Sequence, residues 1–170
     1  MNELLENLYR KHRQGLYSFA LSIVCSPDLA EDAVQNAFAK LFRNPNGNES
    51  VFRNGNGVAY VFQAVRNSAI DLQRADARKL RFSKVLFDRY QSPGDSDCPT
   101  ERLLTRERDE LLKKAIDQLA ETDREAIVLK LFAGLTFEQA GKVAQTSPKT
   151  IATRYRRALE KLENHLKGQL

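Results

Sequence analysis

The chain has 170 residues, of which 42% are hydrophobic, with only 8 Gly and 5 Pro. This length allows one ordinary domain or two small ones, and the composition excludes collagen-like, low-complexity and turn-rich β proteins. Lys and Arg number 27 against 22 Asp and Glu, so the net charge of +5 allows a polyanionic partner without requiring one.

Several other classes of protein are excluded by the sequence. No apolar run approaches the roughly 20 residues of a membrane span, and the acidic N-terminus is not a secretory signal. Cys25 and Cys98 form neither a zinc pattern nor a disulfide framework, which fits a reducing cytosol. His12 and His165 are isolated at opposite ends, and no phosphate-binding or nucleophile motif is present. We therefore expect no metal, no cofactor and no enzymatic activity.

The first 43 residues predict two amphipathic helices. Apolar residues recur at helical spacing over residues 5–23 and again over residues 30–41. Pro27 suits the first turn of the second helix, and Asp28 with Glu31 resembles a capping box. The polar side of this second helix is expected to be a solvated face, with a protein interface as the alternative.

The middle of the chain contains a loop, a third helix and a linker. Residues 44–57 are rich in Asn and Gly and predict a loop, although the strand-like pair Val51-Phe52 leaves a hairpin possible. Helical spacing resumes over residues 58–72 and continues into a basic tail at residues 74–84. Residues 91–100 have no period and no large apolar residue, so we place the domain boundary there.

The last 70 residues predict four helical segments. The first covers residues 101–119, and a capping box from Thr122 to Glu125 opens the second, which ends at Gly134. The two other starts are a capping box from Thr136 to Gln139 and the pair Ser147-Pro148, which begins the last helix. We therefore expect an all-α protein with two small helical domains, residues 1–90 and 101–170, standing apart on a flexible linker.

The strongest functional motif is a helix-turn-helix at residues 135–158. Ala140 and Gly141 provide the small residues needed where the two helices cross, while Ile151 and Tyr155 point inward. The side chains left for solvent or DNA are Lys149, Thr150, Thr153, Arg154, Arg156 and Arg157. Such a helix fits the major groove, where Arg and Lys bind guanine edges. The alternative is the solvated face of an ordinary terminal helix.

A second motif combines aromatic, amide and basic residues within residues 58–81. Aromatic rings can stack on unpaired bases while basic side chains follow the backbone. The residues of this type are Tyr60, Phe62, Arg66, Asn67, Ser68, Gln73, Arg74, Arg78 and Lys79. Phe62 lies on the apolar stripe, so we expect it in the core.

In their order and spacing, these motifs resemble a bacterial RNA polymerase sigma factor of the extracytoplasmic function group, over nearly the whole chain. Residues 28–38 are similar to the family's A-E-D-x-V-Q-x-x-F signature, and residues 59–72 contain the R-N-x-x-I-D core of its promoter-melting segment. Residues 119–162 resemble the fourth region, with its L-[ST]-[FY]-E-x start and T-[IV]-x-[ST]-R recognition helix.

The resemblance implies a transcription initiation factor that binds core RNA polymerase, recognises promoter DNA through two elements and assists strand opening. The second helix would dock on the β′ clamp helices, and the C-terminal domain would meet the β flap. The docking residues implied are Asp32, Gln35, Asn36 and Phe38. The helix beginning at Pro148 would bind the upstream promoter element as duplex DNA.

The third helix would hold the melted promoter element as a single strand. The residues implied for this role are Tyr60, Arg66, Asn67, Ser68, Arg74 and Arg78. The resemblance also implies a cytoplasmic bacterial location, no membrane insertion and a separate regulator such as an anti-sigma factor.

The chain departs from the family pattern at three positions. Asn36 stands where Glu is usual, which bears on docking, and Tyr60 stands where Trp is common. Gln145 replaces the usual Gly of the helix-turn-helix, which puts the geometry of that turn in question.

Two rival hypotheses belong to other classes of protein. A free-standing transcriptional regulator with a response-regulator type of helix-turn-helix would need an N-terminal ligand or phosphoacceptor domain, usually with strands, and the sequence predicts none. An all-helical adaptor without a DNA role would have no need of the basic recognition helix.

Overall fold

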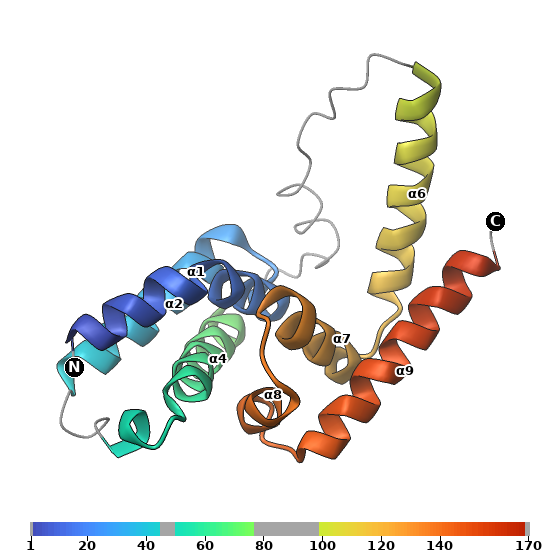
Figure 1. Cartoon of the computed structure of the whole chain (residues 1–170). Helices are drawn as coiled ribbons and strands as arrows, with labels where there is room; N and C mark the ends of the chain where they lie inside the picture. Colours follow the sequence, from blue (N-terminus) through green and yellow to red (C-terminus); the bar gives the residue numbers. More distant parts are fainter. Residues whose placement is uncertain (1, 45–49, 77–98, 169–170) are drawn as a thin grey trace.

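The structure is a computed structural model that describes residues 2–44, 50–76 and 99–168 (Figure 1). Its main helices are α1 (Asn2–Val24), α2 (Pro27–Arg43), α4 (Gly57–Ala75), α6 (Pro99–Asp117), α7 (Glu121–Ile127), the π-helical η1 (Val128–Phe132), α8 (Phe137–Val143) and α9 (Pro148–Lys167). The described ranges contain no strand, which confirms the all-α prediction and provides no support for a strand-bearing regulator domain. None of these helices is long and apolar enough to cross a bilayer.

The N-terminal half, residues 2–76, is a bundle of α1, α2 and α4. Their apolar stripes face one another, and the rings of Phe19 on α1 and Phe62 on α4 lie 5.8 Å apart at the core. Phe62 is fully buried, as its place on the apolar stripe predicts. Gln73 donates a hydrogen bond to the Ile23 carbonyl at 2.7 Å, which joins the ends of α4 and α1.

Two local predictions in this half are wrong. Pro27 does occupy the first turn of α2, but the N-cap is Ser26 and no side chain caps the helix, so the Asp28–Glu31 box does not form. Val51 and Phe52 lie in a single helical turn at residues 50–53 and are not strand-like. The Phe52 ring instead packs edge-on against Tyr60 and covers Gly57, so tertiary packing sets its conformation.

The C-terminal half, residues 99–168, contains the predicted helices with altered ends. α6 already begins at Pro99, so the last two residues of the predicted linker are helical. α7 begins at Glu121 after Ala120, without the predicted capping box at Thr122. The helix continues as the wider π-helical turn η1, and the helical stretch stops just before Gly134. Gly134 has φ of +66° and is the helix stop that the sequence predicts.

Two helix starts in the C-terminal half are confirmed. At α8 the Thr136 hydroxyl accepts from the Gln139 N–H at 3.1 Å, while the Gln139 side chain accepts from the Thr136 N–H at 3.0 Å. At α9 the Ser147 hydroxyl accepts from the Thr150 N–H at 3.0 Å. These reciprocal bonds satisfy backbone donors that a helix start would otherwise leave without partners.

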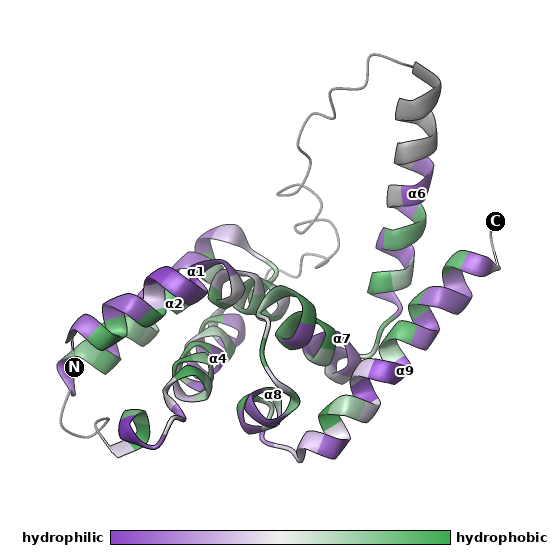
Figure 2. Cartoon of the chain, viewed as in Figure 1, coloured by the Kyte–Doolittle hydropathy of each residue, from purple (hydrophilic) through white to green (hydrophobic). Residues whose placement is uncertain are grey.

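The two halves pack against each other. η1 lies against α1 and α8 lies against α4, and buried side chains from both halves share one large core, while Leu119, Ile127 and Ala158 form a second, small cluster. Figure 2 shows the hydrophobic segment that follows α7 beside α1, while α7 itself and α9 carry many hydrophilic residues. The expectation that the halves stand apart is therefore wrong for the residues that the structure describes.

The boundary between the domains stays a prediction. Most of the expected linker at residues 91–100 and the basic tail beyond α4 lie outside the described residues. The contacts between the halves are made by their helices. An apolar stripe that is wider than one neighbouring helix can cover leaves apolar surface on which a second helix can pack.

Candidate nucleic-acid interface

The turn between α8 and α9 brings the two helices of the predicted helix-turn-helix close together. A Cβ at Gly141 would lie 3.0 Å from the Thr146 carbonyl oxygen and 3.1 Å from the Pro148 nitrogen. Gly141 is therefore required where the turn folds back on α8, as predicted. Gln145 has φ of +54°, and the Thr146 N–H donates to the Gly141 carbonyl at 2.8 Å. Gln145 thus adopts the left-handed conformation of the glycine that it replaces.

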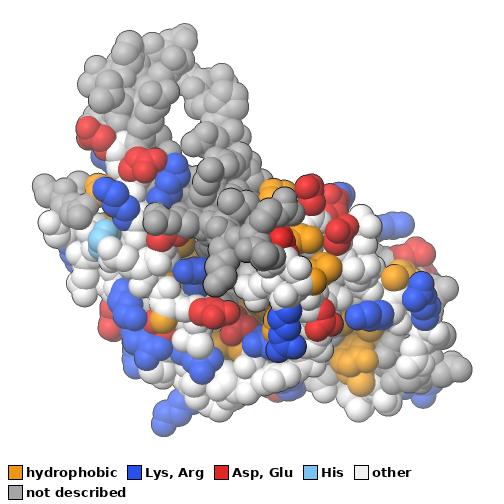
Figure 3. Space-filling model, turned by 180° about the vertical axis from the view of Figure 1, so that it is seen from behind, with side chains coloured by type: hydrophobic (Ala, Val, Ile, Leu, Met, Phe, Trp, Pro, Cys, Tyr) orange, Lys and Arg blue, Asp and Glu red, His pale blue; other side chains and the backbone are white. Residues whose placement is uncertain are grey.

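The first turns of α9 present the polar face that the sequence predicts. Lys149, Thr153 and Arg156 are exposed along one side, whereas Ile151 is buried and anchors the helix. The Thr153 hydroxyl donates to the Lys149 carbonyl at 2.9 Å. From behind, Lys and Arg side chains gather over the part of the molecule that contains α9 (Figure 3).

Three other residues of α9 that the sequence predicts to contact DNA are less accessible to a ligand. Thr150 is half-buried and takes part in the cap of Ser147, and Arg154 is also half-buried. Arg157 is half-exposed, but its guanidinium binds the fully buried Asp123 of α7, with Nε 3.0 Å from Oδ1 and 3.1 Å from Oδ2. Lys161 approaches the same carboxylate at 2.9 Å.

This ion cluster holds α9 on α7. Burial alone would raise the pKa of Asp123, but the hydrogen bonds and charges of Arg157 and Lys161 outweigh it and hold that pKa below its ordinary value. A bidentate pair between a guanidinium and a carboxylate fixes both direction and distance. Arg157 therefore positions the recognition helix in this structure, a role that helical periodicity cannot distinguish from DNA contact.

The residues predicted for a melted strand are only partly accessible on α4. Asn67 and Arg74 are exposed, and Tyr60 is half-buried. Ser68 is buried, and its hydroxyl has no hydrogen-bond partner, so it faces the protein interior rather than solvent. Arg66 donates through Nε to Glu125 of α7 at 3.0 Å. Arg78, also predicted for this role, lies outside the described residues.

The predicted docking residues divide between the surface and the core. Asp32, Gln35 and Asn36 are exposed on the outer face of α2. Phe38 is only 6% exposed and packs edge-on against Tyr9, with ring centroids 5.1 Å apart. Phe38 therefore belongs to the core beneath the predicted docking face and forms no part of the exposed surface.

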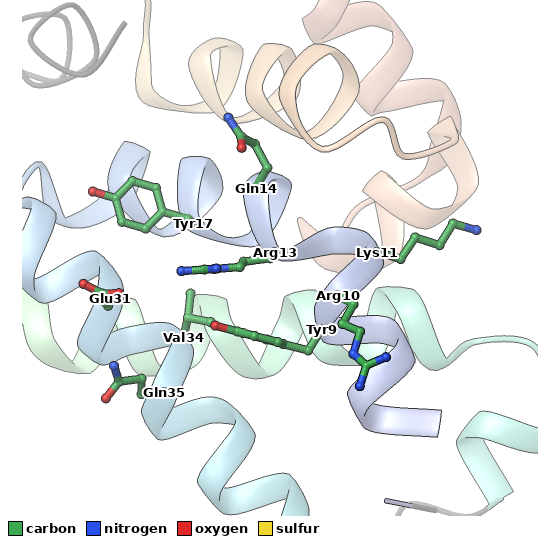
Figure 4. Close-up of a pocket in the computed structure, with 9 residues that line it drawn as sticks. All are labelled: Tyr9, Arg10, Lys11, Arg13, Gln14, Tyr17, Glu31, Val34 and Gln35. Atoms are coloured by element: carbon green, nitrogen blue, oxygen red, sulfur yellow. The ribbon is translucent and has the colours of Figure 1, made fainter. Parts of the chain in front are cut away.

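A hollow of about 580 Å³ lies beside this face, between α1 and α2 (Figure 4). Figure 4 shows Arg13 of α1 extended between two tyrosine rings, with Glu31 and Gln35 of α2 at the other wall. Gln35 belongs to both the hollow and the predicted docking surface, so the two are continuous. Helical periodicity of α1 alone could not reveal the hollow, because its walls come from two helices.

The described residues contain no group of three His, Cys, Asp or Glu side chains that could hold a metal ion.

Two family models match the chain in the order that the motifs predict. Sigma-70 region 2 matches residues 8–79, and Sigma-70 region 4 matches residues 109–162. Curated relatives of the extracytoplasmic function type include ShbA from Streptomyces griseus, 35% identical over 61% of this chain and 55% of its own length. The chain belongs to the extracytoplasmic function sigma factors.

Other sigma factor relatives extend the similarity along the whole chain. CarQ from Myxococcus xanthus is 28% identical over 99% of this chain and 91% of its own length. SigE from Mycolicibacterium smegmatis is 24% identical over 95% of this chain. The matches span only 55% and 61% of the lengths of ShbA and SigE.

Two solved structures share the fold. RpoE from Bartonella quintana, solved with the anti-sigma factor NepR, has a TM-score of 0.63 at 25% identity, covering 99% of this chain and 97% of its own. CnrH, solved with the cytosolic domain of CnrY, has a TM-score of 0.64 at 21% identity, covering 100% of this chain and 92% of its own.

Within this sigma factor, region 2 contains α2, α4 and most of α1, and region 4 contains the helix-turn-helix. The sequence alone missed Glu125 and Asp123 as partners of two predicted DNA-binding arginines. Asp123 lies in the first turn of α7, where acidic residues are expected for helix-dipole reasons alone, and Glu125 follows in the next turn. Their pairing therefore leaves no distinct pattern in the sequence.

Proposed function

We propose that this sigma factor is a transcription initiation factor that binds core RNA polymerase, recognises promoter DNA through two elements and helps the strands to separate. The observation that carries the proposal is the exposed basic face of α9 on a capped helix-turn-helix, in the same chain as the amide and arginine residues of α4. The half matched by region 4 would bind duplex DNA, and the half matched by region 2 would hold a single strand.

For duplex recognition, the first turns of α9 enter the major groove, which is about 12 Å wide and admits a helix. Arg156 is exposed and long enough to bind a guanine edge in bidentate fashion, while Lys149 at the helix start contacts phosphate. Thr153 lies between them on the same face. Arg157 and Lys161 keep the helix at its angle through Asp123.

For strand opening, Asn67 and Arg74 on α4 hydrogen-bond a displaced base and the backbone, with Tyr60 nearby. Unstacking costs a few kcal/mol per base step. A captured base returns about 1–3 kcal/mol through stacking, so capture offsets much of that cost. Basic residues outside the described ranges, including Arg78, would follow the backbone.

Polymerase docking would use the outer face of α2, with Asp32, Gln35 and Asn36 against the β′ clamp helices and region 4 against the β flap. The hollow beside Gln35 would receive a protruding carboxylate of the partner, because Arg13 lies within it. Two weak DNA-binding modules on one chain gain effective concentration once polymerase fixes their geometry. A net charge of only +5 fits such dependence on polymerase.

Regulation would come from a separate anti-sigma factor in the bacterial cytoplasm. The solved complex of RpoE with the anti-sigma factor NepR supports this part of the proposal, because RpoE shares this fold.

The deciding experiment is run-off transcription from fragments of the source genome, with core polymerase and this protein, followed by sequencing of the transcripts. We expect a small set of transcripts that begin at promoters with shared upstream and downstream elements and that need no ATP-driven activator. Core polymerase alone is the control. A transcript set identical to that control would reject the function.

A further inference from the structure

Three basic residues lie close together on α1 without an acidic partner. Arg10, Lys11 and Arg13 are all exposed, and none of them forms an ion pair with an acid in the part of the chain that the structure describes. Arg10 and Arg13 are three positions apart, where like charges destabilise a helix. This positive charge is therefore not neutralised within the described residues, and an anionic ligand would balance it.

Arg10 and Arg13 lie where two hollows adjoin between α1 and α2. In the first hollow, of about 580 Å³, the Arg13 side chain extends along the cavity while Lys11 points away from it (Figure 4). The second hollow, of about 410 Å³, shares Tyr9, Arg10 and Gln35 with the first. Both volumes fall within the roughly 300–1,000 Å³ of small-molecule sites. Because they share residues, the two hollows form one continuous groove, which we call the α1–α2 groove.

The wall of the second hollow is aromatic. The ring centroids of Tyr9 and Phe38 lie 5.1 Å apart, and those of Phe38 and Phe42 lie 6.4 Å apart. Phe42 is 38% exposed, so part of its ring is free to stack on a ligand, and proteins commonly bind nucleobases by such stacking. The Gln35 amide, which lines both hollows, is able to donate and accept hydrogen bonds at the edge of a stacked base.

We propose that the α1–α2 groove binds a purine nucleotide with two or more phosphates. The base stacks on Phe42 in the apolar part, and the phosphates extend past Arg10 to Arg13 in the cationic part. A guanidinium suits a phosphate because it donates two parallel hydrogen bonds to it. Glu31 on the opposite wall is a single negative charge against these two arginines, so the cationic part still favours an anion.

A nucleotide uses the whole groove, whereas simpler ligands use one part of it. Inorganic polyphosphate meets only the arginines, and an uncharged nucleoside meets only the aromatic wall. The binding is independent of the proposed function, because it needs neither polymerase nor promoter DNA. Gln35 also belongs to the predicted docking face, so the nucleotide occupies in the free chain a surface that polymerase would cover in the holoenzyme.

The test is isothermal titration calorimetry of the full chain with ATP in buffer without Mg²⁺. Inorganic tripolyphosphate, adenosine and a short single-stranded DNA oligonucleotide are titrated separately, which distinguishes a nucleotide from a simple anion, a nucleoside and a strand. The variants are Arg13→Gln and Phe42→Leu. Lys40→Gln is the matched control, because it removes the same charge from an exposed position of α2 outside the residues that line both hollows.

We expect ATP to bind at least about tenfold more tightly than tripolyphosphate or adenosine, because it makes both sets of contacts. Arg13→Gln should weaken ATP binding about tenfold or more, and Phe42→Leu should weaken it severalfold while tripolyphosphate binding stays unchanged. Lys40→Gln should match the wild type, and every variant should keep the wild-type circular dichroism spectrum.

Three outcomes would overturn the nucleotide site. The first is an absence of ATP binding at millimolar concentration. The second is ATP binding no tighter than that of tripolyphosphate, or equally weakened in Lys40→Gln and Arg13→Gln, which would show only nonspecific attraction of anions. The third is tighter binding of the oligonucleotide than of ATP through the same two residues, which would assign the groove to a strand.

Discussion

At the scale of single residues, the most consequential finding is that Asp123 is buried beneath the recognition helix. Asn at this buried position would place an NH2 group toward two cations, where it finds no acceptor, and a buried polar group left unsatisfied costs about 1–3 kcal/mol. Asp123→Asn should therefore lower the free energy of unfolding by roughly that amount in urea titrations at pH 7. A variant as stable as the wild type would show that the cluster contributes nothing.

The same carboxylate predicts a dependence on pH. Because the folded-state pKa of Asp123 lies below its unfolded value, the stabilisation is fully present above the unfolded pKa, near 3.9. It is lost as the pH falls from that value through the folded pKa. The stability difference between wild type and Asp123→Asn should thus shrink between about pH 5 and pH 3. A difference that stays constant over this range would refute the assignment.

Gln145 carries a backbone cost that glycine would relieve. A left-handed conformation costs a non-glycine residue about 1–2 kcal/mol, while glycine loses an extra 0.5–1 kcal/mol or so of chain entropy on folding. Gln145→Gly should consequently raise the free energy of unfolding by up to about 1 kcal/mol. Gly141→Ala is the opposite case, because its Cβ would meet the turn, and it should destabilise. Thermal unfolding of both variants tests this pair, and the same sign of change in both would contradict it.

At the scale of elements, α9 has one exposed basic side and one side fixed to α7. Arg156→Ala should weaken binding to the upstream promoter element by about 1–3 kcal/mol and relax its sequence preference, whereas Lys149→Ala should weaken binding evenly across sequences. Lys114→Ala removes the same charge from an exposed position of α6 and is the control. Promoter binding by the reconstituted holoenzyme, measured at two salt concentrations, is the readout. Equal losses of promoter binding in Arg156→Ala and Lys114→Ala would show that Arg156 contributes only its charge and no specific contact.

The element α2 offers a separate test. Asp32→Ala combined with Gln35→Ala should reduce retention of core polymerase in a pull-down at least severalfold, since both side chains are exposed and neither supports the core. The circular dichroism spectrum should stay that of the wild type. Full retention of polymerase would exclude this face as the docking surface.

The sequence predicts the helices better than it predicts the contacts between them. The apolar stripes of α2 and α4, the capping box at Thr136 and the stop at Gly134 all follow from local rules. The box at Thr122 fails because α7 starts two residues earlier, with Ala120 as its N-cap. The turn forms with Gln145 in place of glycine because the backbone hydrogen bonds at the end of α8 determine the conformation of this residue.

The sequence predicts which residues make up the candidate site, but it does not predict which of their side chains are accessible to DNA. Lys149, Thr153 and Arg156 are exposed as expected. Arg66 and Arg157 are instead paired with acids 59 and 34 positions away, and such long-range partners have no spacing rule. A single sequence shows which side chains can bind DNA, while their present partners depend on tertiary packing.

At the scale of the whole molecule, the two halves share one core in the free chain although their proposed tasks lie on different parts of a promoter. Inter-domain contacts within a chain resemble transient interfaces, so they can open when a larger partner competes for the same surfaces.

The most direct test of the account is permanganate footprinting of thymines on a promoter identified by the run-off experiment, together with protection mapping of its upstream duplex. With core polymerase and the wild-type protein, we predict reactive thymines over the downstream element and protection over the upstream element, without ATP. Asn67→Ala should reduce the thymine reactivity while the upstream protection remains. A promoter that is bound but stays fully double-stranded in the wild-type holoenzyme would contradict the account.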